Sequence, residues 1–209
     1  MKQIFRVVVG VFFLVTLAWA DAPDTLIKNT VQEVITVIQQ DKEIRNGDQK
    51  KILDLVDAKI LPRFDFSRMT QLAVGKYWRR ATPVQRDALI VEFRNMLVRT
   101  YAKAFAVYND QTVEVMPLKV AAGATDVTVK TSINKPGGKG VAVDYEMRKM
   151  ADDWKVYDVS IEGVSMVMNY RSTFAGEIDQ GGIDGLIKTL SERNASADEV
   201  APKVKAAAK

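Results

Sequence analysis

The chain has 209 residues, of which 30 are Lys or Arg and 26 are Asp or Glu, and it contains neither Cys nor His. These absences exclude disulfide bonds, Ser-His-Asp and Cys-His catalysis, and zinc sites built from His or Cys. The formal net charge of +4 is small, and no basic run is interleaved with aromatic residues, so we expect no nucleic-acid partner.

Residues 1–20 have the three parts of a secretory signal peptide. Lys2 and Arg6 form the charged start, residues 7–17 are an apolar run, and Ala18-Trp19-Ala20 is a small-x-small cleavage site. The apolar run is short for a bilayer span, so we predict cleavage after residue 20, with an uncleaved anchor as the alternative. Because no Cys follows the cleavage site, a lipoprotein anchor is excluded.

We predict one domain over residues 21–194, with a helical part at 24–108, a sheet with further helices at 111–194, and a disordered tail at 195–209. The tail is rich in Ala and Lys and lacks apolar periodicity. The exported chain would then depend on core burial for its stability.

Apolar residues recur at helical spacing through the first part of the domain. The first predicted helix runs from Thr25 to about Arg45, and the second begins at Asp48 and ends at Pro62. A short helix follows and stops at Gly75. The strongest signal is the capping box at residues 82–85, Thr-Pro-Val-Gln, which starts a helix predicted to continue to Tyr108.

The apolar period then changes from 3.6 to 2, which indicates strands near residues 113–115, 127–133, 141–147 and 154–161. Short turns between them predict an antiparallel meander. In the last strand the alternation slips by one residue, which predicts a β-bulge at Tyr157/Asp158. The fold class is therefore α+β, with a curved sheet of four to five antiparallel strands packed with helices.

After a break at Gly163, apolar residues again follow helical spacing, and we expect this helix to fold across the sheet. A last helix follows the Gly181-Gly182 break. Such an arrangement encloses a volume that is either filled by a dense core or left as a cavity for an apolar ligand. Each buried methylene contributes about 0.8 kcal/mol, so one acyl chain could gain on the order of 10 kcal/mol.

The residues that could act in catalysis show no clear active-site pattern. Asp144 and Glu146 lie on the polar face of their strand and are expected to be solvated, and no glycine loop suited to phosphate opens a helix. Arg171 lies within the helical stripe after Gly163. It would either reach solvent or a carboxylate, or lie at the cavity mouth and meet a phosphate.

Two long stretches carry a family resemblance, residues 70–86 (TQLAVGKYWRRATPVQR) and residues 153–171, the second continued to residues 182–186. They resemble the MlaC family, the toluene-tolerance or maintenance-of-lipid-asymmetry family. The resemblance implies a monomeric periplasmic protein of Gram-negative bacteria that carries phospholipid between an outer-membrane lipoprotein complex and an inner-membrane ABC transporter complex. It further implies a nuclear-transport-factor-like cone with acyl chains inside and the head group near the surface.

With this resemblance, a cavity is favoured over a solid core, and no enzyme activity, metal or cofactor other than the lipid cargo is expected. A small cone-fold enzyme that uses a buried Tyr/Asp pair on an apolar substrate, and an adaptor protein with a solid core, stay as alternatives. Apart from Arg171, the predicted lipid-binding residues are apolar or aromatic and are expected to point inward. They are Leu97, Tyr101, Phe105, Val143, Tyr145, Met147, Trp154, Val156, Val159, Ile161, Val164, Val167, Tyr170, Arg171, Phe174, Ile183 and Ile187.

Overall fold

The computed structural model describes residues 21–102, 111–151 and 153–196. Its N-terminal helices are α1 (Pro23–Gln40), α2 (Lys42–Arg45), α3 (Gln49–Leu55), the π-helix η1 (Val56–Ile60), the 3-10 helix η2 (Leu61–Arg63), α4 (Phe66–Val74), the 3-10 helix η3 (Gly75–Arg80) and α5 (Pro83–Tyr101). The strands are β1 (Thr112–Val115), β2 (Asp126–Asn134), β3 (Val141–Met150), β4 (Asp153–Ile161) and β5 (Val164–Ser165), followed by η4 (Met168–Tyr170) and α7 (Arg171–Ala195). The predicted signal peptide at residues 1–20 and nearly all of the predicted tail lie outside the described residues.

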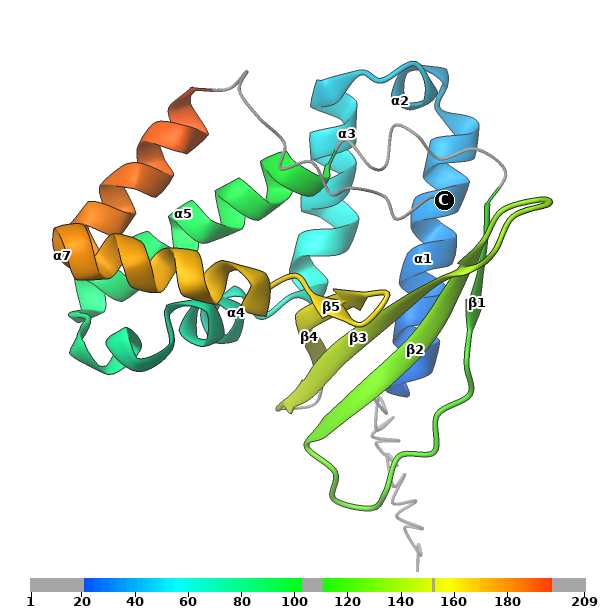
Figure 1. The fold of residues 1–209 in the computed structure, drawn as a ribbon. Helices are drawn as coiled ribbons and strands as arrows, with labels where there is room; N and C mark the ends of the chain where they lie inside the picture. Colours follow the sequence, from blue (N-terminus) through cyan, green and yellow to red (C-terminus); the bar gives the residue numbers. More distant parts are fainter. Residues whose placement is uncertain (1–20, 103–110, 152, 197–209) are drawn as a thin grey trace, which may run out of the picture.

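The five strands form one antiparallel sheet in the order β1-β2-β3-β4-β5, which confirms the predicted meander. Figure 1 shows α1 lying across one face of this sheet, while α4, α5 and α7 gather beside it. Among the described residues, no helix is both long and apolar enough to cross a membrane.

The predicted single helix from Thr25 to Arg45 is wrong, because the chain breaks at Asp41. Asp41 has an extended backbone, and its carboxylate accepts hydrogen bonds from the amides of Glu43 and Ile44. A side chain that satisfies the free amides at a helix start favours a new helix there, which is α2.

The other N-terminal start signals are confirmed. Asp48 caps α3 through the amide of Lys51, and the capping box of α5 is complete, with Thr82 and Gln85 each accepting a bond from the other's backbone amide. In the described residues α5 ends at Tyr101. The prediction continues this helix to Tyr108, but residues 103–110 lie outside the described part of the chain.

The bulge predicted in the fourth strand is present. Glu146 pairs with Asp158 and Met147 pairs with Val156, so Tyr157 is the extra residue of β4. An extra residue resets the alternation of side chains, and Val156 and Val159 therefore face the same side of the sheet.

The sequence predicts a helix that starts directly after Gly163, and this start is wrong. Glu162 and Gly163 both have positive φ, 49° and 78°, and form a tight turn that pairs Ile161 with Val164 in a short hairpin. Positive φ at both turn positions is the geometry that matches the twist of a two-residue hairpin. α7 consequently begins at Arg171, and the predicted break before the last helix appears as a kink at Gly182.

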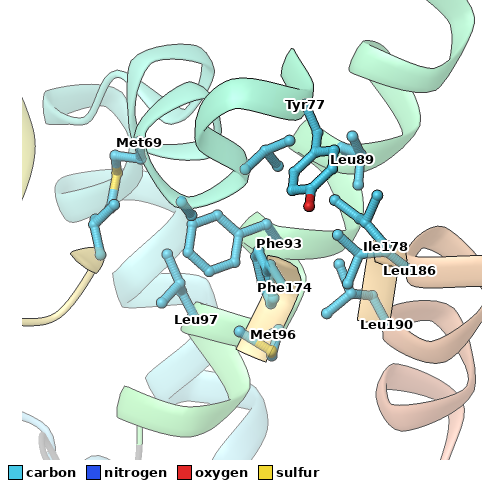
Figure 2. Packing of buried hydrophobic residues seen from close by; sticks show 13 residues of the cluster. Met69, Tyr77, Leu89, Phe93, Met96, Leu97, Phe174, Ile178, Leu186 and Leu190 are labelled. Atoms are coloured by element: carbon cyan, nitrogen blue, oxygen red, sulfur yellow. The ribbon is translucent and has the colours of Figure 1, made fainter. Parts of the chain in front are cut away.

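Three separate apolar clusters hold the fold together. The helical cluster joins α4, α5 and α7, and the rings of Phe93 and Phe174 meet edge to face at 5.2 Å in its centre (Figure 2). The sheet cluster joins the start of α1 to β2, β3 and β4. The N-terminal cluster joins the rest of α1 to α2, α3 and η1. The buried members of the sheet cluster are Leu26, Ile27, Val129, Val143, Met147, Trp154, Val156 and Val159. Those of the N-terminal cluster are Val34, Ile38, Ile44, Ile52, Leu55, Val56 and Ala102.

Candidate ligand-binding cavity

A cavity of about 370 Å³ lies where the three clusters meet. Each cluster supplies part of its wall: Val143, Val156 and Val159 come from the sheet cluster, Ile38 from the N-terminal cluster and Leu97 from the helical cluster. Ligand pockets commonly measure about 300–1,000 Å³ and are mostly apolar. The gap left between separately packed clusters therefore has the size and chemistry of a binding site for an apolar molecule.

The sheet wall is fixed by strand register. Val143 pairs with Ile161 and Tyr145 pairs with Val159, so these four side chains form two rows on one face of β3 and β4. The bulge keeps Val156 on that face beyond the slip, and all five border the cavity. Without the extra residue, Val156 and Val159 would point to opposite faces.

The opposite wall is α1, and here the structure differs from the predicted cover. Its apolar stripe, which includes Ile27, Val31, Val34 and Ile38, lies over the sheet and borders the cavity. The prediction gave this covering role to the helix after Gly163. The hairpin at residues 161–164 turns the chain back, so α7 packs on α4 and α5 instead.

Seven of the residues predicted from the sequence border the cavity: Leu97, Tyr101, Val143, Tyr145, Val156, Val159 and Ile161. Five others lie in or against the helical cluster and do not border the cavity: Val167, Tyr170, Phe174, Ile183 and Ile187. Met147 and Trp154 are buried within the sheet cluster. Val164 is 61% exposed. Phe105 lies outside the described residues.

Arg171 does not border the cavity. Its side chain is exposed, and its guanidinium lies about 3.1 Å from the position that a Cβ would take at Gly75. Arg171 therefore belongs to the surface between η3 and α7.

Sequence reasoning missed several cavity residues, including Thr30 on α1 and Arg63 and Phe64 at η2. The apolar period of α1 was visible in the sequence, but a period does not identify the surface on which a helix packs. Arg63 gave no signal, because a single cation after a Pro is typical of an exposed helix end.

Polar groups at the cavity are few. Burial raises the pKa of the Tyr145 phenol, and a hydrogen bond with Thr131 opposes that rise. Burial also raises the pKa of Tyr170, which hydrogen-bonds to the cavity residue Tyr101. Both effects keep these phenols protonated and uncharged at neutral pH.

Thr30 differs from three other threonines in helices. Thr36, Thr70 and Thr100 each donate their hydroxyl at 2.7 Å to the carbonyl four residues earlier. Thr30 borders the cavity, and its hydroxyl oxygen is buried and has no hydrogen-bond partner among the described residues. A buried hydroxyl without a partner costs about 1–3 kcal/mol, so this group favours a ligand with a hydrogen-bonding atom.

The buried Tyr/Asp pair of the enzyme alternative is not found among the described residues that border the cavity. No carboxylate is among the described residues that border the cavity, and Glu146 lies on the other face of the sheet, where it accepts a bond from Thr128. Within residues 21–102, 111–151 and 153–196, no cluster of Asp and Glu could hold a metal ion.

Comparisons with known proteins show which proteins this chain is similar to. The family model described as MlaC protein matches residues 28–192. Toluene tolerance protein ttg2D of Pseudomonas putida is 28% identical over 185 residues, covering 88% of this chain and 85% of the relative. The intermembrane phospholipid transport system binding protein MlaC of Haemophilus influenzae is 22% identical over 174 residues, covering 82% and 81%.

A solved structure is also similar. The phospholipid-binding protein of Ralstonia solanacearum, determined in complex with a phospholipid, is 40% identical and superimposes with a TM-score of 0.78, covering 86% of this chain and 100% of that one.

Proposed function

Because the chain belongs to the MlaC family, we propose that it binds phospholipid and holds the acyl chains in the cavity between α1 and the sheet. The observation that carries this proposal is the apolar cavity itself, present in a chain that is 40% identical to a protein solved with a phospholipid. We propose that residues 21–194 form a single lipid-binding domain, and the described residues that border the cavity lie within this range.

The volume supports hydrocarbon as the cargo. A water molecule takes about 30 Å³ of liquid, and a methylene is of similar size, so 370 Å³ holds roughly a dozen methylenes. At about 0.8 kcal/mol each, their burial contributes on the order of 10 kcal/mol, which offsets the cost of ordering the lipid.

We further propose that the protein is a carrier and not an enzyme. It would work as a monomer in the periplasm of a Gram-negative cell, reached through the signal at residues 1–20. There it would move phospholipid between outer-membrane and inner-membrane Mla complexes, in transient contact with each. Support comes from the name of the Haemophilus influenzae relative, which describes a binding protein of an intermembrane phospholipid transport system.

Lipid extraction tests the binding proposal. The mature protein is purified without detergent from a Gram-negative host, extracted with organic solvent, and its lipid is identified and quantified by mass spectrometry. We expect phospholipid in near-stoichiometric amount. Protein that is folded, free of lipid and unable to take lipid from vesicles would overturn the proposal.

A further inference from the structure

Two polar residues that border the apolar cavity come from two different helices. Arg63, the last residue of η2, and Thr30, on α1, both border it. Figure 1 shows α1 and the α3–η1 segment running in opposite directions, and the ion pair of Lys59 with Glu33, at 3.0 Å, fixes their register. Arg63 lies four residues beyond Lys59, and Thr30 lies three residues before Glu33. Antiparallel elements therefore bring Arg63 and Thr30 to the same level, about one turn from that ion pair.

The charge of Arg63 has no close counter-ion among the described residues. Its charge helps to lower the pKa of the Asp153 carboxyl, but Asp153 is already paired with Lys155 at 2.8 Å. Arg63 is partly buried, and its neighbours Leu61 and Phe64 are apolar cavity residues. A guanidinium in such a place is complemented by an anion, and its planar fork suits a phosphate.

The C-terminal half of α1 borders the cavity through apolar side chains. Ile38, Val56 and Ala102, at 2%, 3% and 7% exposed, border it there, on the C-terminal half of α1 and the helices packed against it. A molecule that complements both sets of residues carries hydrocarbon at one end and an anion next to a hydrogen-bond acceptor at the other.

We propose that Arg63 and Thr30 form the polar subsite for the cargo, with the Arg63 guanidinium on the lipid phosphate and the Thr30 hydroxyl donating to an acyl ester carbonyl. In a glycerophospholipid only the glycerol carbons separate the phosphate from the nearest ester, so side chains from two adjacent elements can meet both groups. The lipid then enters tails first, with its tails toward Ile38 and its phosphate between α1 and η2. This inference rests on the proposed lipid-binding function.

A competition experiment tests the Arg63 contact. Wild type and Arg63→Met are each incubated with a detergent-solubilised equimolar mixture of a phospholipid and a diacylglycerol with the same acyl chains, and bound species are counted by native mass spectrometry. We expect wild type to favour the phospholipid by about tenfold or more, the effect of a hydrogen bond to a charged group. Arg63→Met should bind the two lipids about equally and keep the same total occupancy, while Arg63→Lys should keep part of the preference.

Arg171→Met is the matched control, because Arg171 is a cation away from the cavity, and it should keep the wild-type ratio. The proposal is overturned if Arg63→Met keeps that ratio, or if Arg171→Met loses it equally. If Arg63→Met does not fold, which its thermal unfolding reports, Arg63→Lys and Arg63→Gln carry the same test.

Thr30 is tested with a second pair of lipids, a diacyl phospholipid and its dialkyl ether analogue, which lacks the acyl carbonyls. Wild type should favour the diacyl lipid several-fold, and Thr30→Val should remove that preference while leaving the preference over diacylglycerol unchanged. Equal binding of ester and ether lipids by wild type would overturn the Thr30 contact. Failure of wild type to bind any of these lipids would instead overturn the proposed function.

Discussion

Filling the cavity from the sheet side should remove the lipid and leave the fold intact. Val143 is 5% exposed, lies near the start of β3 and borders the cavity beside Ile161. Val143→Trp adds about seven non-hydrogen atoms in the space available to roughly a dozen methylenes. The cavity can then no longer accommodate about half of the acyl chain.

The loss can be sized from the same burial energies. About seven displaced methylenes at about 0.8 kcal/mol correspond to roughly 5 kcal/mol, or between three and four orders of magnitude in Kd. Overpacking a filled core costs about 1–3 kcal/mol, and the cost here should lie at or below the lower end because the space already exists.

Native mass spectrometry of the purified mature protein measures the lipid-bound fraction, and thermal unfolding followed by circular dichroism measures stability. Val91→Trp is the matched control, since Val91 is 51% exposed on α5 and should tolerate the change without loss of lipid. A folded Val143→Trp protein with wild-type lipid content would refute the assignment of this cavity to the acyl chains.

Three further predictions concern stability. Because burial raises the pKa of Tyr145, the unfolded chain loses this proton first, so stability should fall as the pH rises above about 10. Tyr145→Phe should lessen that fall in urea unfolding between about pH 8 and pH 11, and an unchanged slope would contradict it. Gly75→Ala should cost about 1–2 kcal/mol in thermal unfolding, because φ at Gly75 is 62° and the new Cβ meets Arg171; a neutral effect would contradict the strain. Asp158→Ala should cost about 1–3 kcal/mol and speed amide exchange at Val167, whose amide bonds to that carboxylate at 3.1 Å, and unchanged exchange would count against this bond.

Features with a local cause could be predicted from the sequence. The bulge was visible because one extra residue, Tyr157, shifts the alternation on either side of it. The capping box was visible because Thr82 and Gln85 lie three residues apart and satisfy each other's amides. The sheet wall of the cavity followed from the same alternation, which is why Val143, Tyr145, Val156, Val159 and Ile161 were all among the predicted residues.

Features decided by distant contacts could not be predicted. Glu162-Gly163 is not a typical hairpin dipeptide, since a charged residue takes a positive φ of 49°, so the turn that sends α7 away from the sheet gave no signal. α1 and α7 each present apolar residues at helical spacing, and spacing alone does not say which of them covers the sheet. The same uncertainty placed the candidate phosphate contact at Arg171 and left Arg63 unnoticed.

The division of the interior into three clusters has a consequence for how the protein can change over evolutionary time. Phe93 and Phe174 pack deep within the helical cluster, whereas Val34 and Val159 belong to other clusters and face the cavity. Substitutions at distant sites without shared partners have additive effects on stability. The walls that the sheet and N-terminal clusters supply can therefore be reshaped one residue at a time with little effect on the helical cluster, so the range of accepted ligands can diverge among descendants that keep the same scaffold.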